Sequence, residues 1–405
     1  MEHRTYLWLH LAIDDIRTTL KHSLRPGANL ITLVPPSVNA AYEKILCRVP
    51  DNEMDIVKKM LGIIVAARRP LTIQEMAIAL GIATCSKPQT TKQARLDSSN
   101  LDEKLRQLCG LFVFTSKSKI YLIHQTAREF LINKGVERPE SMVWQECVNE
   151  QDADRVLLEI CVAYLHEEIQ KDLCQLPTGA EHCTESDAFL GYSATYWIEH
   201  MRITSGFESR FLRLASSLCC VTQTSVWLRS VEPPSRYYYC YEHEPLPFFC
   251  AARWELDDVA YLLLEDSKIQ ITTEVLEKAA ADEPAVMKFL VESLHRGGNE
   301  VTITGKVLES AAANWRSGLD IIQYLIDRKD IALRITRRVL IMALKHPFGG
   351  NILHLLRPRS SLIRRILRKK IQNHTSARLS GNTKWNIRRN KVKLNMKGKQ
   401  TCRSD

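Results

Sequence analysis

A single histidine lies where a short apolar stretch meets the start of an expected helix, within residues 122–131. Thr126 and Glu129 have the spacing of a capping box, which predicts a helix that begins at Ala127. The first backbone N–H groups of a helix have no partner inside the helix and favour negative charge. His124 stands beside these groups, so this corner of the chain is a candidate anion site.

The sequence lacks the loop that binds nucleotide phosphates in P-loop proteins. Such a loop needs Gly-x-x-x-x-Gly-Lys followed by Ser or Thr. The nearest approach, Gly298 to Lys306, has six residues between its glycines and is followed by Val307 instead of a hydroxyl residue. We therefore expect this chain alone neither to bind nor to hydrolyse a nucleotide.

Two further groups of residues have the types, but not the spacing, of chemical sites. Gly191–Thr195 contains a central serine, yet it lacks the second glycine of a hydrolase elbow and falls in a helical pattern. Cys174, His182 and Cys183 lack the paired short spacing of zinc ligands, and buried thiols are the better interpretation of the cysteines. The sequence thus predicts no enzyme, no metal site and no cofactor.

The charge is unevenly distributed along the 405 residues. The net charge is +10, but Arg357–Asp405 alone holds 16 basic residues and one acid, so the rest carries 40 basic and 45 acidic residues. Twelve cysteines without a regular framework indicate reduced, intracellular usage. The longest apolar run, Met60–Ala67, is far shorter than the roughly 20 residues of a spanning helix. We expect a cytoplasmic protein without a membrane span, with the basic tail as an alternative nuclear address.

Helical and β patterns predict a winged helix in residues 50–135. A helix stopped by a proline is followed by Thr72 and Glu75, the spacing of a second capping box, and then by a third helix. Two runs rich in β-branched and aromatic residues, Leu111–Thr115 and Ile120–His124, flank a short polar turn and predict a hairpin. Three helices, a hairpin and a closing helix are the elements of a winged helix.

Helical patterns without obvious chemistry flank this domain. Residues 1–49 predict two helices separated by a proline-broken linker, and Met1 stands so close to the first that the chain is expected to begin within a domain. Residues 136–232 predict a helical spacer in which aromatic side chains pack between helices. The basic tail, residues 359–405, is expected to be disordered from Asn373 onward because it loses its apolar residues there.

Beyond Pro245 the sequence repeats itself with a period of 32 residues. Ile-Thr pairs begin at Ile271, Ile303 and Ile335, and each is followed at the same offset by Val-Leu. If each threonine caps a helix, the isoleucine and the leucine form a hydrophobic staple. A second helix follows in each unit, and such paired helices predict an ankyrin-like α-solenoid over residues 245–358. The predicted fold class is therefore mainly α.

The order of these elements resembles the fungal NOD-like receptors, the NACHT signal-transduction NTPases with ankyrin arrays that include heterokaryon-incompatibility proteins. Leu7-Trp8 and Pro35–Glu43 look like the helices that close a NACHT module. Ala66–Thr72 and Leu122–Thr126 look like its winged helix, a type also labelled after inositol deacylases. Tyr192–His200 is similar to the helical spacer that follows in the same proteins.

The resemblance implies a role for the winged-helix histidine. In that family this histidine contacts the phosphates of bound ADP and holds the receptor closed, and His124 fits its position. A histidine donor next to a helix N-terminus suits a phosphate. Because the phosphate-binding loop is missing, we interpret His124 as a vestigial nucleotide contact in a relative that lacks the NTPase core, with residues 1–49 as a remnant of the NACHT-associated helices.

The predicted function is non-catalytic and regulatory, namely binding of protein partners through the ankyrin-like repeats. An intact NACHT receptor is one candidate partner. Loop tips between repeats carry recognition in solenoids. The candidate contacts are the expected exposed turn residues Trp254, Glu255, Asp257, Asn314, Trp315 and Arg316.

Two other functions stay open. The chain is alternatively a fragment of a nucleotide-regulated NACHT NTPase whose P-loop lies upstream of Met1 or is supplied in trans. A third hypothesis is nucleic-acid binding through the basic tail. The presumed recognition helix of the winged helix, Leu101–Cys109, carries as many acids as bases and does not favour DNA binding.

Overall fold

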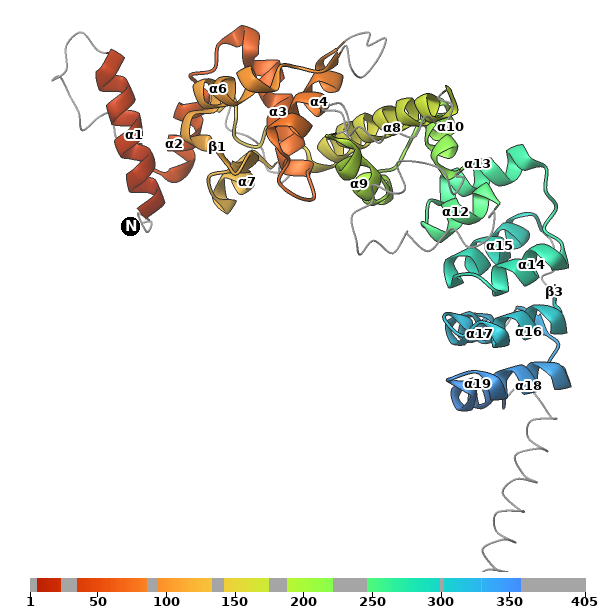
Figure 1. The fold of residues 1–405 in the computed structure, drawn as a ribbon. Coiled ribbons are helices and arrows are strands. Elements are labelled where there is room, and N and C mark those ends of the chain that lie inside the picture. Colours follow the sequence, from red (N-terminus) through yellow and green to blue (C-terminus); the bar gives the residue numbers. More distant parts are fainter. Residues whose placement is uncertain are drawn as a thin grey trace, which may run out of the picture. The chain divides into compact units, whose positions relative to one another are not determined.

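The computed structural model describes residues 6–22, 35–85, 94–132, 142–174, 188–220, 246–298, 302–328 and 330–357. Within these ranges the fold is mainly α, with a winged helix and a small antiparallel sheet, which confirms the predicted fold class (Figure 1). Contacts divide the chain into two compact units, Met1–Ser267 and Lys268–Asp405. No helix in the described ranges is both long enough and apolar enough to cross a membrane.

Two helices precede the winged helix and pack on each other, α1 (Tyr6–His22) and α2 (Val38–Leu46). The buried Trp8 indole donates a hydrogen bond of 3.0 Å to the carbonyl oxygen of Pro35, just before α2. Ser37 caps α2 because its hydroxyl accepts from the backbone N–H of Ala40. This arrangement holds α1 against the start of α2.

The helices of the winged helix are α3 (Met54–Ala66), α4 (Ile73–Thr84) and α6 (Ser98–Cys109). The capping box predicted at the start of α4 is confirmed: Thr72 Oγ1 accepts from the Glu75 N–H, and the Glu75 carboxylate accepts from the Thr72 N–H. Arg69 then holds the same carboxylate with two hydrogen bonds of 2.8 and 2.9 Å. The turn between α3 and α4 is therefore fixed by side chains.

The wing is a hairpin of β1 (Val113–Ser116) and β2 (Lys119–Leu122). Its turn is tighter than predicted, because Lys117 and Ser118 have positive φ angles of 49° and 60°, as a two-residue hairpin turn requires. The hairpin is joined to the helices by backbone hydrogen bonds from Ile73 N–H to Ser118 O and from Ile120 N–H to Leu71 O.

The core of the winged helix includes a side chain from α2. The Tyr42 ring lies edge-on to Phe112 at 5.1 Å and tilted against Phe130, in α7 (Gln125–Leu131), at 5.5 Å. The Tyr42 hydroxyl shares a hydrogen bond of 2.9 Å with the hydroxyl of Thr126. Helix α2 is thus part of the winged-helix core.

A buried carboxylate ties α2 to the segment that leaves the winged helix. Glu43 accepts hydrogen bonds from three successive backbone N–H groups, those of Val143, Trp144 and Gln145, at 2.6, 3.1 and 3.0 Å. The Trp144 side chain is itself buried. Residues about 100 positions apart in the sequence are joined by this one side chain.

The rest of the first unit is helical. Its elements are α8 (Glu150–Cys174), α9 (Leu190–Ile203), α10 (Ser209–Cys219), α12 (Pro247–Arg253) and α13 (Asp257–Ser267). Trp197 of α9 and Trp254, just after α12, meet edge to face at 5.7 Å. Helices α12 and α13 therefore contact the spacer, and they belong to the first compact unit.

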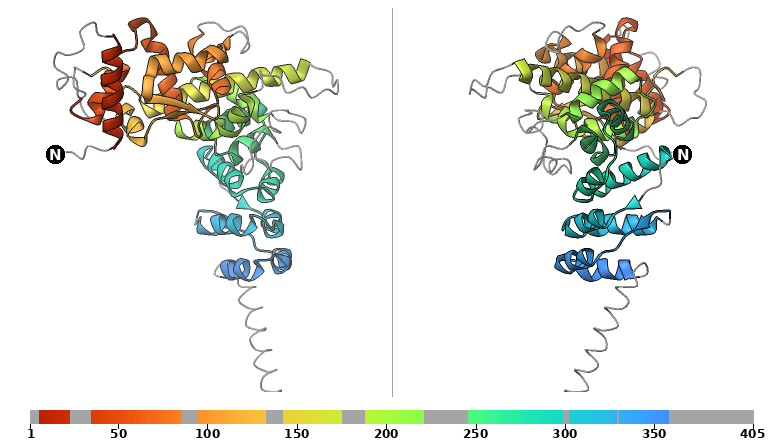
Figure 2. Two further views of the ribbon diagram at one scale, coloured as in Figure 1. Left: turned by 60° about the vertical axis from the view of Figure 1, so that its left-hand side comes forward. Right: turned by 90° about the vertical axis from the view of Figure 1, so that its right-hand side faces the viewer.

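Three helix pairs that stack on one another make up the described part of the second unit (Figures 1 and 2). The pairs are α14 (Thr273–Ala280) with α15 (Pro284–Arg296), α16 (Gly305–Ala313) with α17 (Gly318–Asp327), and α18 (Arg337–Lys345) with α19 (Gly349–Leu356). First helices contact first helices, and second helices contact second helices. The segments between pairs add a short parallel sheet of β3 (Thr302–Ile303) and β4 (Ala332–Leu333).

The threonines predicted to cap the first helices all stand at cap positions. Thr272 and Thr336 accept from the backbone N–H groups of Val275 and Val339, as predicted. Thr304 makes no side-chain cap bond, and its buried hydroxyl has no hydrogen-bond partner among the described residues. The side-chain caps are thus confirmed at two of the three repeats.

Replacing Glu43 by alanine tests the link between α2 and residues 143–145. We expect Glu43→Ala to lower the free energy of unfolding by about 3 kcal/mol, because three backbone donors lose their acceptor. Glu53→Ala is the matched control, since Glu53 forms a surface ion pair with Lys104 that is worth less than about 1 kcal/mol. Urea unfolding followed by circular dichroism measures both, and equal losses would contradict the role given to Glu43.

Candidate functional site

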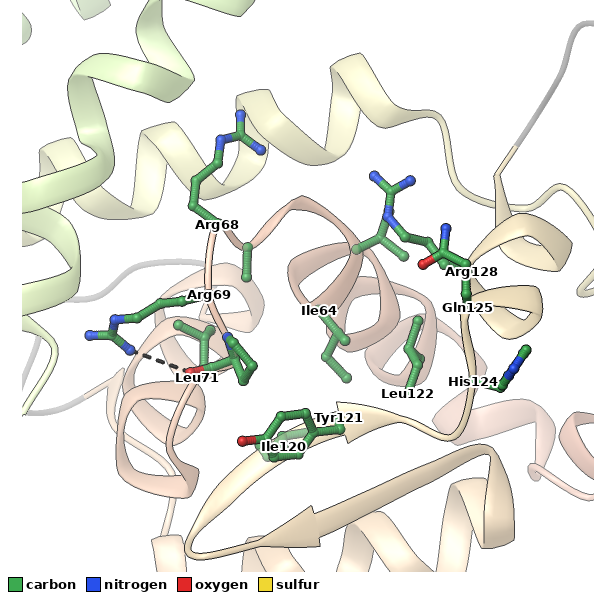
Figure 3. A pocket seen from close by; sticks show the side chains of 13 residues that line it. Ile64, Arg68, Arg69, Leu71, Ile120, Tyr121, Leu122, His124, Gln125 and Arg128 are labelled. Carbon is green, nitrogen blue, oxygen red and sulfur yellow. Dashed lines mark hydrogen bonds between the residues drawn. The ribbon is translucent and has the colours of Figure 1, made fainter.

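A pocket of about 260 Å³ opens beside His124 in the winged helix (Figure 3). It lies between the end of α3, the turn before α4, strand β2 and the start of α7. Its apolar lining includes Ile64, Leu71, Ile120 and Leu122. Its polar lining includes Arg68, Arg69, His124, Gln125 and Arg128. The predicted anion corner, His124 and the start of α7, therefore forms one side of this pocket.

His124 itself caps the helix that was predicted to begin after it. Helix α7 begins at Gln125, and His124 Nδ1 accepts from the Thr126 N–H at 3.2 Å. The predicted capping box of Thr126 and Glu129 is wrong, because the Thr126 hydroxyl bonds instead with Tyr42 and with His124 Nδ1. Since Nδ1 accepts a backbone N–H, Nε2 is the ring nitrogen left to donate to a ligand.

The arginines of the pocket are each paired with a carboxylate. Arg68 Nη2 lies 2.5 Å from Asp154 Oδ1, and Arg128 Nη2 lies 2.6 Å from Glu150 Oε1. Arg69 is bound to the Glu75 carboxylate as described above. Figure 3 shows the guanidinium groups of Arg68 and Arg69 pointing in different directions. An anion in this pocket would have to compete with carboxylates already in place, so its basic lining attracts anions weakly.

A buried polar network lies behind Arg68, and the sequence reasoning did not foresee it. His200 Nδ1 donates to Asp154 at 2.6 Å, and His200 Nε2 accepts from the Tyr192 hydroxyl at 3.0 Å. That hydroxyl in turn accepts from the Arg68 N–H at 3.1 Å. The network joins the turn after α3 to helices α8 and α9.

Electrostatics keep this network in one protonation state. Burial lowers the pKa of His200, although the bond to Asp154 opposes that shift. Burial alone would raise the pKa of Asp154, but the bonds from His200 and Arg68 outweigh it and lower the pKa. Neutral His200 and ionised Asp154 are thus favoured. Because His200 is completely buried, no substrate reaches it, and the network positions helices. The eight-residue spacing of Tyr192 and His200 was the available signal in the sequence.

The described cysteines divide between buried and exposed thiols: Cys109, Cys161, Cys219 and Cys250 are buried, whereas Cys47, Cys85 and Cys220 are exposed. Burial raises the pKa of the Cys109 thiol to about 12 and raises that of Cys161 as well, so neither thiol is reactive. No group of three His, Cys, Asp or Glu residues in the described ranges is arranged to hold a metal ion. The side chains of Cys174, His182 and Cys183 lie outside the described residues.

The first predicted turn of the array differs from expectation. Trp254 is only 1% exposed and packs on Trp197, so the prediction that it is exposed is wrong. The indole of Trp254 is buried because α12 and α13 pack against the helices of the spacer. Glu255 is exposed, has a positive φ angle of 57° and pairs with Arg202. Asp257 is exposed at the start of α13.

The turn between α16 and α17 presents an exposed aromatic side chain on a fixed backbone. The Asn314 amide group donates to the carbonyl oxygens of Ala280 and Asp282 in the preceding pair, at 3.3 and 2.7 Å. Its side-chain oxygen accepts from the N–H groups of Arg316 and Ser317. Trp315 is 67% exposed, and the Arg316 guanidinium lies 5.5 Å from its ring.

The next turn repeats this anchoring 32 residues further along the chain. His346 Nε2 donates to the backbone oxygen of Asn314 at 2.9 Å, and His346 Nδ1 accepts from the Phe348 N–H at 3.0 Å. Phe348 is 54% exposed. Sequence reasoning missed His346 and Phe348, although they stand one repeat beyond Asn314 and Arg316. We call the turns Asn314–Ser317 and His346–Phe348 the turn row.

Comparison with known proteins bears on both units. Residues 45–141 match the family described as GPI inositol-deacylase, winged helix domain. Residues 294–321 match a family described only as a domain of unknown function. No solved structure matches. The first unit therefore contains a winged helix of the inositol-deacylase type.

Two curated fungal proteins are similar to the chain. Vegetative incompatibility protein HET-E-1 of Podospora anserina is 23% identical over 236 residues, which are 52% of this chain and 16% of that protein. Azaphilone pigments biosynthesis cluster protein L of Monascus ruber is 23% identical over 177 residues, 41% of this chain and 35% of that protein. The chain thus spans about a third of these relatives or less. With the winged helix, these likenesses support a distant relationship to the fungal NOD-like receptors.

The cap of α7 in this inositol-deacylase-type winged helix is tested by two substitutions of His124. We expect His124→Ala to lower the free energy of unfolding by about 1 kcal/mol, because the N-cap acceptor is lost. His124→Asn should restore most of this loss, since asparagine is a good N-cap residue. Urea unfolding compares them, and equal stabilities of the two variants would show that capping is not what His124 contributes.

The buried network predicts a pH dependence of stability. His200 has a lower pKa in the folded chain than in the unfolded chain, so the unfolded chain binds the proton more readily. The contribution of His200 to the free energy of unfolding is therefore fully present above the ordinary histidine pKa of about 6.5, and it is lost as the pH falls below that pKa. We expect the unfolding free energy to fall between pH 7.5 and 5.5, and less steeply in His200→Gln. His10→Gln, at an exposed site on α1, should keep the wild-type slope.

Proposed function

We propose that this chain is a non-catalytic regulatory protein, related to the fungal NOD-like receptors, that binds protein partners through an ankyrin-like array. The turn row is its contact surface. The observation that carries this proposal is the exposure of Trp315 and Phe348 on turns that are anchored by Asn314 and His346. The 32-residue period and the stacking of helix pairs support the ankyrin-like reading.

The chemistry of the turn row suits protein recognition. Tryptophan and arginine are enriched among the residues that dominate binding energy in interfaces. Arg316 lies over the Trp315 ring, so the two side chains restrict one another before a partner arrives. Anchored turns lose little conformational freedom on binding. A fitting partner has apolar pockets for the two aromatic rings.

A nucleotide-regulated switch is the second candidate function. It is favoured by the pocket beside His124, with its apolar lining and three arginines. The phosphate-binding loop would then come from a segment upstream of Met1 or from another chain. The carboxylates already paired with these arginines count against strong phosphate binding by the described residues alone. The basic tail proposed for nucleic-acid binding lies outside the described residues.

A pull-down with the full chain tests the turn row. We expect the double variant Trp315→Ala, Phe348→Ala to lose partners recovered from fungal extract by at least about 30-fold, the loss for a 2 kcal/mol hot spot. Phe114→Ala is the matched control, because Phe114 is an exposed aromatic residue on the wing. Quantitative mass spectrometry reads both. Recovery of the same partners by the double variant would overturn the proposal.

Titration calorimetry with ADP separates the two candidate functions. We expect no binding of ADP to the chain alone, because its phosphate-binding loop is missing and its pocket arginines are paired. Binding that weakens on His124→Ala would favour the switch instead. Since His124→Ala also removes a helix cap, His124→Asn serves as the control that keeps the cap and removes the imidazole.

A further inference from the structure

Another pocket of about 260 Å³ opens on the winged helix, between α3 and α6. Helix α4 packs against both of these helices and contributes Leu80 to the lining. This pocket shares no lining residue with the one beside His124. We call it the helix pocket, and its apolar lining also includes Val57, Met60, Leu101, Leu105 and Leu108.

Core side chains form most of this apolar lining. Leu101, Leu105 and Leu108 recur at helical spacing along α6, while Val57 and Met60 line the pocket from α3. All of these side chains except Leu108 are less than 8% exposed, and Leu108 is half-buried. The pocket therefore reaches from the surface into the core between the two helices. A molecule that fills it would gain dispersion contacts and remove apolar surface from water.

The size of the helix pocket limits what it can hold. Apolar cavities of about 150 Å³ bind a benzene ring, and pockets for drug-sized ligands usually begin at about 300 Å³. The helix pocket, at about 260 Å³, has room for two fused rings. A partner helix has a diameter of roughly 10–12 Å with its side chains, so it would lie on the rim instead of entering. A two-ring compound is therefore the best fit.

The polar lining of the pocket consists of Glu53, Asp97, Asn100 and Lys104. Asp97, Asn100 and Lys104 are exposed and Glu53 is half-buried, so these groups stand at the mouth. Lys104 Nζ donates to Glu53 Oε1 at 2.8 Å, and the two charges balance each other. Among the lining residues, Asp97 is then the charged group that remains.

The carboxylate of Asp97 has room for one more hydrogen bond. Its Oδ1 accepts from the backbone N–H and the hydroxyl of Ser99, at 2.9 and 2.6 Å, whereas its Oδ2 accepts from the Asn100 amide group at 2.7 Å. The hydrogen bonds from Ser99 are the chief cause that lowers the pKa of Asp97, with a smaller contribution from the charge of Arg95. Asp97 is therefore ionised at neutral pH, and Oδ2 can accept from a further donor.

We propose that the helix pocket binds a small two-ring aromatic amine. The fused rings lie between α3 and α6 against Met60 and Leu105, and the ammonium group donates to Asp97 at the mouth. Such a ligand suits both parts of the pocket, since its rings replace water on the apolar lining and its cation gives Asp97 a charge-assisted hydrogen bond. It contacts three helices of the winged helix and stabilises the domain on binding. This site is independent of what the turn row binds.

NMR of the full chain, isotope-labelled at its methionine methyl groups, tests the site directly. The probes are 2-naphthylmethylamine and 2-naphthoate, which share their rings but differ in charge. We expect the amine to shift the Met60 signal saturably and to bind about five-fold more tightly than naphthoate, the ratio for one exposed charge contact. Met76 is the internal reference, because it is buried on α4 and does not line the pocket. Equal shifts at both methionines, or no saturable shift at Met60, would overturn the proposal.

Variants of the lining supply the second measurement. Ile56→Trp adds bulk at the pocket and should weaken binding of the amine at least ten-fold, whereas Ile13→Trp, at a 40% exposed site on α1, should leave it unchanged. Asp97→Asn keeps a good N-cap for α6 but removes the charge, so it should bind both probes equally.

Three results would contradict the site. They are wild-type binding by Ile56→Trp, an undiminished preference for the amine in Asp97→Asn, and a Met60 signal that moves with protein concentration alone, which would mean that a second copy fills the pocket. If Ile56→Trp does not fold, the titration of Met60 in the wild type decides.

Discussion

The carboxylate of Glu43 sets the architecture of the first unit, because it accepts three consecutive backbone N–H groups at residues 143–145. A buried carboxylate costs free energy unless its oxygens are satisfied, and here the chain returning toward α8 satisfies them. Tyr42, its neighbour in α2, packs at the same time on Phe112 and Phe130. The adjacent side chains of Tyr42 and Glu43 therefore join α2 to the winged helix and to residues 143–145, which follow the winged helix.

The sequence predicted what depends on local patterns. The Thr72–Glu75 capping box, the hairpin and the paired helices of the second unit all arise from residues within a few positions of each other. It failed where distant residues compete. The hydroxyl of Thr126 bonds to Tyr42, 84 positions away, and Trp254 is buried by Trp197. Neither partner can be identified from spacing, because the pairing exists only after the helices pack.

The candidate sites differ in how their charges are balanced. The pocket beside His124 contains three arginines, yet carboxylates from α4 and α8 neutralise them, so most of its electrostatics serves the fold. The turn row has the opposite character, since its backbone is held by Asn314 and His346 while the rings of Trp315 and Phe348 face water. Anchoring without covering is the arrangement expected of a recognition surface.

The bonds from Asn314 to Asp282 and from His346 to Asn314 have a consequence for how such an array changes in evolution. Each bond joins residues 32 positions apart, so inserting or deleting one residue between the two partners moves the donor away from its acceptor unless a loop absorbs the change. Duplication or loss of a whole repeat keeps every such donor opposite its acceptor. The array is therefore built to vary in the number of its repeats while holding their length nearly constant.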